Sequence, residues 1–189
     1  MPRLFVGLEI PSAIGVQLSG LRGGLPGARW IDVENYHVTL RFIGDIDEPT
    51  ADRVADILDD IRRRPFPVTI KGARSFGGKK PHSVFACVEP TPDLMALQAD
   101  IERKMQMVGL PAEQRKFTPH ITIARVRGAS GSAVANYLGM RGFFRAGPFT
   151  AEDFTLLSSR ASQGGGPYIA EEVYPLDAPA FDYGLEQRI

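Results

Sequence analysis

A short pattern of polar and apolar residues occurs twice in this chain and constrains its fold more than any other feature. The stretch YHVTLRF covers residues 36–42, and the stretch PHITIAR covers residues 119–125. In each copy a histidine is followed by an apolar residue, a threonine and another apolar residue. Side chains on a β-strand alternate between its two faces. The pattern therefore predicts two strands that each bury one face and present an imidazole and a hydroxyl on the other.

The polar residues of the two copies are the first candidates for a functional site: His37, Thr39, His120 and Thr122. Two of the three histidines in the chain lie in this pattern, which argues against a chance repeat. By the same alternation Arg41 shares the face of His37 and is a further candidate. The alternative is a pair of ordinary half-buried strands whose histidines and threonines make local hydrogen bonds.

Hydrophobic periodicity predicts that strands and helices alternate along the chain. We expect strands over about 4–10, 37–44, 68–76, 82–89, 117–125, 148–158 and 168–174, and helices over about 12–22, 50–63, 91–108 and 132–138. The glycines at 164–166 lack the lysine and Ser/Thr of a phosphate-binding loop, so they are interpreted as a hairpin turn.

This order contains an internal repeat with halves at about 3–76 and 82–159. Phe5 and Phe85 are 80 residues apart, whereas His37 and His120 are 83 apart, as are Phe66 and Phe149. The repeat predicts an α+β fold with two pseudo-symmetric lobes built from a duplicated βαβαβ unit. We expect antiparallel-rich sheets to line a central cleft with the helices outside. Residues 1–177 would form a single bilobal domain, followed by a C-terminal tail over 178–189.

Composition narrows the classes of protein. The net charge is zero over 189 residues, which argues against a protein that wraps a long nucleic-acid backbone but not against one that recognises a nucleic-acid end. Cys87 is the sole cysteine, so an intramolecular disulfide is excluded and a reducing compartment fits. The apolar run at 4–10 is too short for a membrane span. We therefore expect a cytoplasmic monomer that does not associate with membranes.

Two histidines facing one small anion suit phosphodiester cleavage without a metal. One neutral imidazole can take a proton from the attacking oxygen while one imidazolium protonates the leaving oxygen. Threonine hydroxyls can donate hydrogen bonds to the non-bridging oxygens, where negative charge builds in the transition state. The sequence thus favours an enzyme that needs no metal and no cofactor.

The segments RWIDVENYHVTLRFIG at 29–44 and FTPHITIAR at 117–125 resemble the two signature motifs of the 2H phosphoesterases. More narrowly, they resemble the RNA 2′,3′-cyclic phosphodiesterases, historically called 2′-5′ RNA ligases. The likeness extends over nearly the whole chain and includes the opening segment RLFVGLEIP at 3–11.

The resemblance implies hydrolysis of RNA 2′,3′-cyclic phosphate ends to 2′-phosphomonoesters. It implies that His37 is the proton donor to the departing 3′ oxygen, that His120 is the proton acceptor from water, and that Thr39 and Thr122 hold the phosphate. It further implies that Phe42 stacks on the terminal base and that Arg125 pairs with the phosphate. The expected partners are RNA ends or nucleotides that carry a 2′,3′-cyclic phosphate.

Other functions remain open at this stage. The same pocket could serve an RNA-end or nucleotide-binding module, or a 2′-5′ phosphodiester ligase or hydrolase. A metal site built from His37, His82 and His120 is disfavoured, because their spacing matches no ligand motif and no carboxylate cluster accompanies them. His82 is interpreted as a surface or hydrogen-bonded histidine and not as a third catalytic group. The basic run from Lys71 to Lys80 is either a solvated turn or a contact for RNA phosphates.

Overall fold

The computed structural model describes residues 3–159 and 167–177, arranged as nine strands, four α-helices and one 3-10 turn in those residues. The predicted glycine turn at 164–166 and the predicted tail over 178–189 lie outside the described residues. The elements in chain order are β1 (Arg3–Glu9), α1 (Ser12–Ser19), β2 (Ala28–Trp30), η1 (Val33–Asn35), β3 (His37–Gly44), α2 (Glu48–Leu58), β4 (Phe66–Phe76), β5 (Ser83–Val88), α3 (Pro92–Met107), β6 (His120–Val126), α4 (Gly131–Arg141), β7 (Arg145–Ala151), β8 (Asp153–Ser159) and β9 (Tyr168–Pro175).

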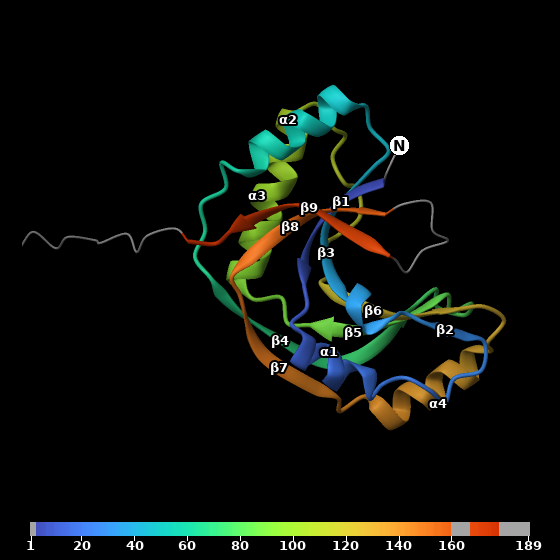
Figure 1. Ribbon diagram of the computed structural model, residues 1–189. Helices are drawn as coiled ribbons and strands as arrows, with labels where there is room; N and C mark the ends of the chain where they lie inside the picture. Colours follow the sequence, from blue (N-terminus) through green and yellow to red (C-terminus); the bar gives the residue numbers. More distant parts are fainter. Residues whose placement is uncertain (1–2, 160–166, 178–189) are drawn as a thin grey trace, which may run out of the picture.

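The strands form two antiparallel sheets, which confirms the predicted fold class. The first sheet has the order β3-β1-β8-β9, and the second has the order β2-β6-β5-β4-β7. The two sheets contact each other through β3 and β6, which are the two strands that carry the repeated pattern. Figure 1 shows the two sheets curving away from this contact, with the helices on their outer sides.

The last strand of each half crosses to the sheet of the other half. β4 ends the first half but pairs with β5, and β8 ends the second half but pairs with β1. The single strand predicted over 148–158 is therefore wrong, because the chain divides at Glu152 into β7 and β8. β7 pairs with β4 in the second sheet, whereas β8 belongs to the first.

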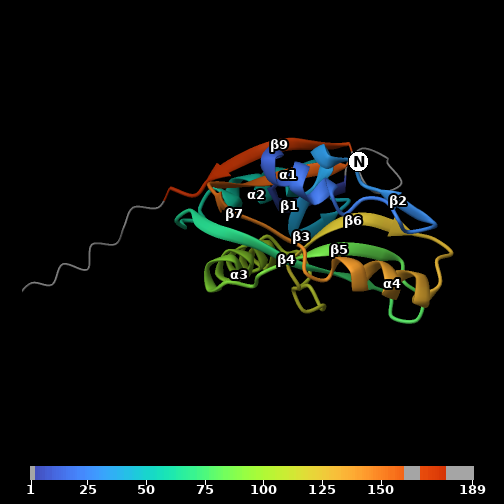
Figure 2. The same cartoon turned by 90° about the horizontal axis from the view of Figure 1, so that it is seen from below.

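The helices cover the outer faces of the sheets, and α2 and α3 pack against each other. α3 contacts α2, β3 and β4, whereas α1 contacts β7 and α4 contacts β4. Figure 2 shows α3 and α4 well separated along the second sheet. α3 buries four residues at helical spacing, Leu94, Leu97, Ile101 and Met105, as predicted. α2 ends at Leu58, five residues before its predicted end, although Ile61 in the following turn is still buried.

The two histidine strands, β3 and β6, each hold an extra residue just after the threonine relative to the neighbouring strand. Val6 and Gly7 of β1 pair with Arg41 and Thr39, so Leu40 has no partner on β1. Val84 and Phe85 of β5 pair with Ala124 and Thr122, so Ile123 is unpaired in the same way. These β-bulges lie three residues after each histidine, and each one reverses the alternation of faces beyond it.

The strand pairing also corrects the predicted 80-residue offset between β1 and β5, the first strands of the two halves. Gly7 lies opposite Thr39, and the residue opposite Thr122 is Phe85. Phe85 thus corresponds in position to Gly7, and not to Phe5 as the 80-residue spacing suggested. The match between Phe5 and Phe85 in sequence reflects two aromatic residues that approach the histidines from different register positions.

Candidate active site

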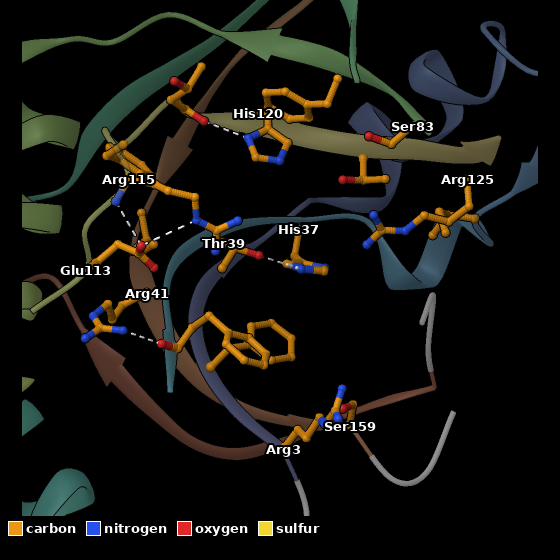
Figure 3. Close-up of a pocket in the computed structure, with 18 of the residues that line it drawn as sticks. Arg3, His37, Thr39, Arg41, Ser83, Glu113, Arg115, His120, Arg125 and Ser159 are labelled. Carbon is orange, nitrogen blue, oxygen red and sulfur yellow. Dashed lines mark hydrogen bonds and ion pairs between the residues drawn. The ribbon is translucent and has the colours of Figure 1, made fainter. Parts of the chain in front are cut away.

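A cleft of about 680 Å³ lies between the two sheets, and both histidines of the repeated pattern line it. Figure 3 shows His37 on β3 and His120 on β6 directed into the same space from the two walls of the cleft. Thr39, Thr122, Phe42, Arg125 and Arg41 also line it. The structure therefore brings together every residue that the sequence analysis named as a candidate.

The two imidazoles are held in the same way. Nδ1 of His37 lies 2.9 Å from the carbonyl oxygen of Asn35, and Nδ1 of His120 lies 2.6 Å from that of Thr118. In both cases the acceptor is the backbone of the residue two positions earlier. A carbonyl accepts only, so Nδ1 carries the proton and Nε2 is the nitrogen that exchanges protons in the cleft.

Aromatic rings enclose each histidine. Phe5 and Tyr168 lie 4.8 Å from the ring of His37 between centroids. Phe76 and Phe85 lie at 4.9 and 5.0 Å from the ring of His120. These rings restrict imidazole rotation and exclude water from one side of each histidine, which prepares the two groups for proton transfer with little rearrangement.

Burial lowers the pKa of both histidines. It lowers the pKa of His37 to about 4, with the Asn35 hydrogen bond opposing the shift and the charges of His120 and Arg125 adding to it. Burial also lowers the pKa of His120, and Arg125 again acts in the same direction. The charge of His120 contributes to the low pKa of His37, so the two groups are close enough to interact electrostatically. An anion bound between them would favour the protonated form of either.

The two threonines differ in the described part of the chain. Oγ1 of Thr39 lies 3.0 Å from Nε2 of His37 and donates to it when the imidazole is neutral. No such bond joins Thr122 to His120 among the residues that the structure describes. The hydroxyl of Thr122 therefore remains available to a ligand, whereas that of Thr39 must first leave its histidine.

The β-bulges place Phe42 and Arg125 in the cleft. Both residues lie five positions after a histidine, so strict alternation would turn them away from it. Because each strand holds an extra residue at Leu40 or Ile123, both side chains return to the face of the histidines. Phe42 is 46% exposed and Arg125 is exposed. An exposed aromatic ring and an exposed guanidinium are available to a ligand.

The same bulge corrects the prediction that alternation aims Arg41 at the histidines. Arg41 follows the bulge and is buried, with 8% of its surface exposed. Its guanidinium forms an ion pair with Glu102 of α3 and donates to the carbonyl oxygens of Phe42 and Pro111. Arg41 thus borders the cleft while its donors are directed to the protein, as Figure 3 shows for its bond beside Phe42.

A loop that was not predicted from the sequence forms part of the cleft wall. Glu113, Arg115 and Lys116 line the cleft, and the backbone N–H and Nε of Arg115 donate to a carboxylate oxygen of Glu113. The adjacent basic pair just before the second histidine strand was the signal available in sequence. His82, interpreted as a surface residue, is exposed and also borders the cleft.

Among residues 3–159 and 167–177, no three His, Cys, Asp or Glu side chains are grouped so that they could hold a metal ion. In the same residues no helix is long and apolar enough to cross a membrane.

Comparison with known proteins identifies the class to which this fold and site belong. The model of the 2′-5′ RNA ligase superfamily matches residues 11–163, and the chain belongs to that superfamily. The predicted family is therefore confirmed.

Within this superfamily, the chain is similar to several curated RNA 2′,3′-cyclic phosphodiesterases. An RNA 2′,3′-cyclic phosphodiesterase of Thermotoga maritima is 33% identical over 66% of this chain and 70% of its own length. That of Methanothermobacter thermautotrophicus is 26% identical over 92% of this chain and 98% of its own length. That of Aeropyrum pernix is 33% identical over 56% of this chain, and the match spans 61% of its own length.

Solved structures confirm the fold. Escherichia coli LigT complexed with 3′-AMP aligns with 93% of this chain and 99% of its own, with a TM-score of 0.75 and 23% identity. A protein of Thermus thermophilus aligns with 93% of this chain and 98% of its own, with a TM-score of 0.76 and 21% identity.

Proposed function

We propose that this protein hydrolyses RNA 2′,3′-cyclic phosphate ends to 2′-phosphomonoesters by acid–base catalysis with two histidines. The observation that carries the proposal is the matched pair His37 and His120, each held at Nδ1 by a backbone carbonyl in one cleft. The relatives named RNA 2′,3′-cyclic phosphodiesterase support the choice of substrate.

In the proposed reaction the cyclic phosphate binds between the two imidazoles. Neutral His120 accepts a proton from water at Nε2 while the water oxygen attacks phosphorus. His37 donates a proton from Nε2 to the 3′ oxygen as the bond from phosphorus to that oxygen breaks. The products are a 3′ hydroxyl and a 2′-phosphate, and a proton returned through solvent restores the starting state. Each proton transfer typically contributes about 10²- to 10⁴-fold in rate.

The low pKa of His37 requires that substrate binding charge it. With a pKa of about 4, this imidazole is neutral at pH 7 before substrate binds. A bound phosphodiester offsets the positive charge of Arg125 and places a negative charge beside both rings, which raises their pKa values. The hydroxyl of Thr39 can then turn from Nε2 of His37 to a phosphate oxygen, so that Nε2 becomes free to carry the proton.

Groups around the histidines would fix the substrate. We assign Thr39 and Thr122 to the non-bridging oxygens, Arg125 to the phosphate charge and Phe42 to the terminal base. Arg41 was expected to contact the substrate, but its bonds to Glu102, Phe42 and Pro111 assign it instead to holding the cleft wall. Stacking on Phe42 would tolerate any base, which suits an enzyme that processes varied RNA ends.

The test is a panel of oligonucleotides that end in a 2′,3′-cyclic phosphate, with the position of the product phosphate determined by NMR. We expect 2′-phosphate products only. A 3′-phosphate product would contradict the assignment of the leaving oxygen, and binding without turnover would favour a binding module. Incubation of the same cyclic phosphate oligonucleotides with RNA carrying a free 5′ hydroxyl would show whether the site also joins ends through a 2′-5′ linkage, because attack of the 5′ oxygen on phosphorus would break the bond to the 3′ oxygen.

A further inference from the structure

A second cavity of about 440 Å³ adjoins the cleft. It lies over β4 and β5, and its lining includes Lys71, Arg74, Cys87 and Glu89. Thr118 lines both hollows, and its carbonyl oxygen accepts the Nδ1 hydrogen bond of His120. The second cavity therefore begins where the wall of the candidate active site ends.

The strand pairing shows that His120 and residues of this cavity project from the same face of the second sheet. Cys87 of β5 lies directly opposite His120, and Arg74 of β4 lies opposite Phe85, whose ring contacts His120. Paired residues project from the same face of a sheet. Arg74 is two strands away from His120, so with a spacing of about 4.8 Å between strands it stands roughly 10 Å from the reaction centre across the sheet.

Positive charge collects along this face although the chain as a whole is neutral. Lys71 lies directly opposite Arg145 of β7, and Arg74 lies three residues further along β4. Glu89 is the acidic residue beside these three cations, and its carboxylate lies 3.1 Å from Nζ of Lys71. Arg74 and Arg145 are exposed and form no ion pair with any residue that the structure describes.

We propose that this cavity is a subsite for the RNA chain on the 5′ side of the terminal nucleotide. Arg74 and Lys71 would contact the phosphate of the second or third nucleotide while the cyclic phosphate lies between the histidines. A spacing of roughly 10 Å fits a flexible chain that carries one phosphate per nucleotide, with a rise of about 3.4 Å per nucleotide along the axis of a stacked strand. The inference rests on the proposed function and narrows its substrate class to RNA chains longer than one nucleotide.

The experiment compares a 2′,3′-cyclic mononucleotide with a trinucleotide that ends in the same cyclic nucleotide. We expect the wild-type protein to show a higher kcat/KM for the trinucleotide. Arg74→Ala should lower the ratio of the two values by roughly two- to fivefold, as for one exposed ion pair. Arg74→Lys should retain most of the ratio. Arg53→Ala, which removes an exposed cation on α2, is the matched control and should leave the ratio unchanged.

The dependence of kcat/KM on salt concentration gives a second test of the phosphate contact made by Arg74. Loss of one phosphate contact should make the slope of log kcat/KM against log salt for the trinucleotide shallower by about 0.7. Equal kcat/KM for both substrates in the wild type would overturn the subsite, as would an unchanged ratio in Arg74→Ala.

Failure of the proposed function has a different signature, which is no hydrolysis of either substrate by the wild type. In that case fluorescence anisotropy with a labelled trinucleotide still tests the subsite. Arg74→Glu should weaken binding of the trinucleotide more than Arg53→Glu does, and equal effects of the two substitutions would overturn the subsite.

Discussion

Phe42 and Arg125 occupy equivalent positions on the two walls of the cleft, each five residues after a histidine and two after the unpaired residue of a β-bulge. Without the bulges both side chains would project from the opposite face of their strands. The fold thus uses the same local irregularity twice, once to expose an aromatic ring and once to expose a cation. Under the proposed function, this difference between two otherwise similar walls would give a bound nucleotide a preferred direction.

The exposed ring of Phe42 leads to a prediction about binding. Phe42→Ala should raise KM for a 2′,3′-cyclic mononucleotide by about five- to 150-fold, since stacking of a base on an aromatic ring contributes about 1–3 kcal/mol. Phe42→Tyr should retain a KM near that of the wild type, and kcat should change little in both variants. Phe143→Ala is the control, because Phe143 is 96% exposed and does not line the cleft. An Ala variant with an unchanged KM would exclude the stacking role.

Arg41 leads to a prediction about stability. Arg41→Ala should lower the free energy of unfolding by about 3 kcal/mol, because it leaves the Glu102 carboxylate partly buried without its cation. It should also raise KM, because the loop at Pro111 loses the donor that ties it to β3. Urea unfolding and steady-state kinetics would measure the two effects. Arg53→Ala should change stability by less than about 0.5 kcal/mol, and a similar small loss in Arg41→Ala would count against the positioning role.

The pKa values lead to a prediction about pH. The profile of kcat/KM reflects the free enzyme and is centred on the mean of the pKa values of acid and base. Burial lowers the pKa of His37 to about 4 and lowers that of His120 below 6.5, so the optimum should lie below pH 6.5. The profile of kcat should be displaced to higher pH, because the bound phosphate favours the imidazolium forms. A kcat/KM optimum above about pH 7 would be inconsistent with these shifts.

Metal independence is a separate prediction. Dialysis against EDTA should leave kcat and KM unchanged, because the proposed proton transfers use only His37 and His120. Activity would be measured before dialysis, after it, and after addition of zinc or magnesium. Loss of activity that either ion restores would contradict the two-histidine mechanism.

The main outline of the fold could be predicted from sequence because it follows from local patterns. The alternation around His37 and His120 placed both strands correctly up to the threonines, and the apolar spacing from Leu94 to Met105 defined α3. The paired strands also led to the superfamily, which the comparison of the whole chain confirms.

Features that depend on tertiary pairing could not be predicted in this way. The residues around Leu40 give no sequence signal of a bulge. The prediction that Arg41 shares a strand face with His37 was therefore wrong. The division at Glu152 was missed because the segments on either side of it can both be extended, and only their neighbours place them in different sheets. The loop that carries Arg115 has no periodicity, and its place in the cleft follows from its bond to Arg41 through Pro111.

The most direct test of the account measures hydrolysis and binding separately in His37→Ala and His120→Ala. Each variant should lose about 10²- to 10⁴-fold in kcat for a 2′,3′-cyclic phosphate while its dissociation constant for a 2′-phosphate product changes little. His82→Ala, which removes the third histidine at the rim of the cleft, should retain kcat within a few-fold. Substantial turnover in either His37→Ala or His120→Ala would contradict the claim that two imidazoles act on one phosphorus atom.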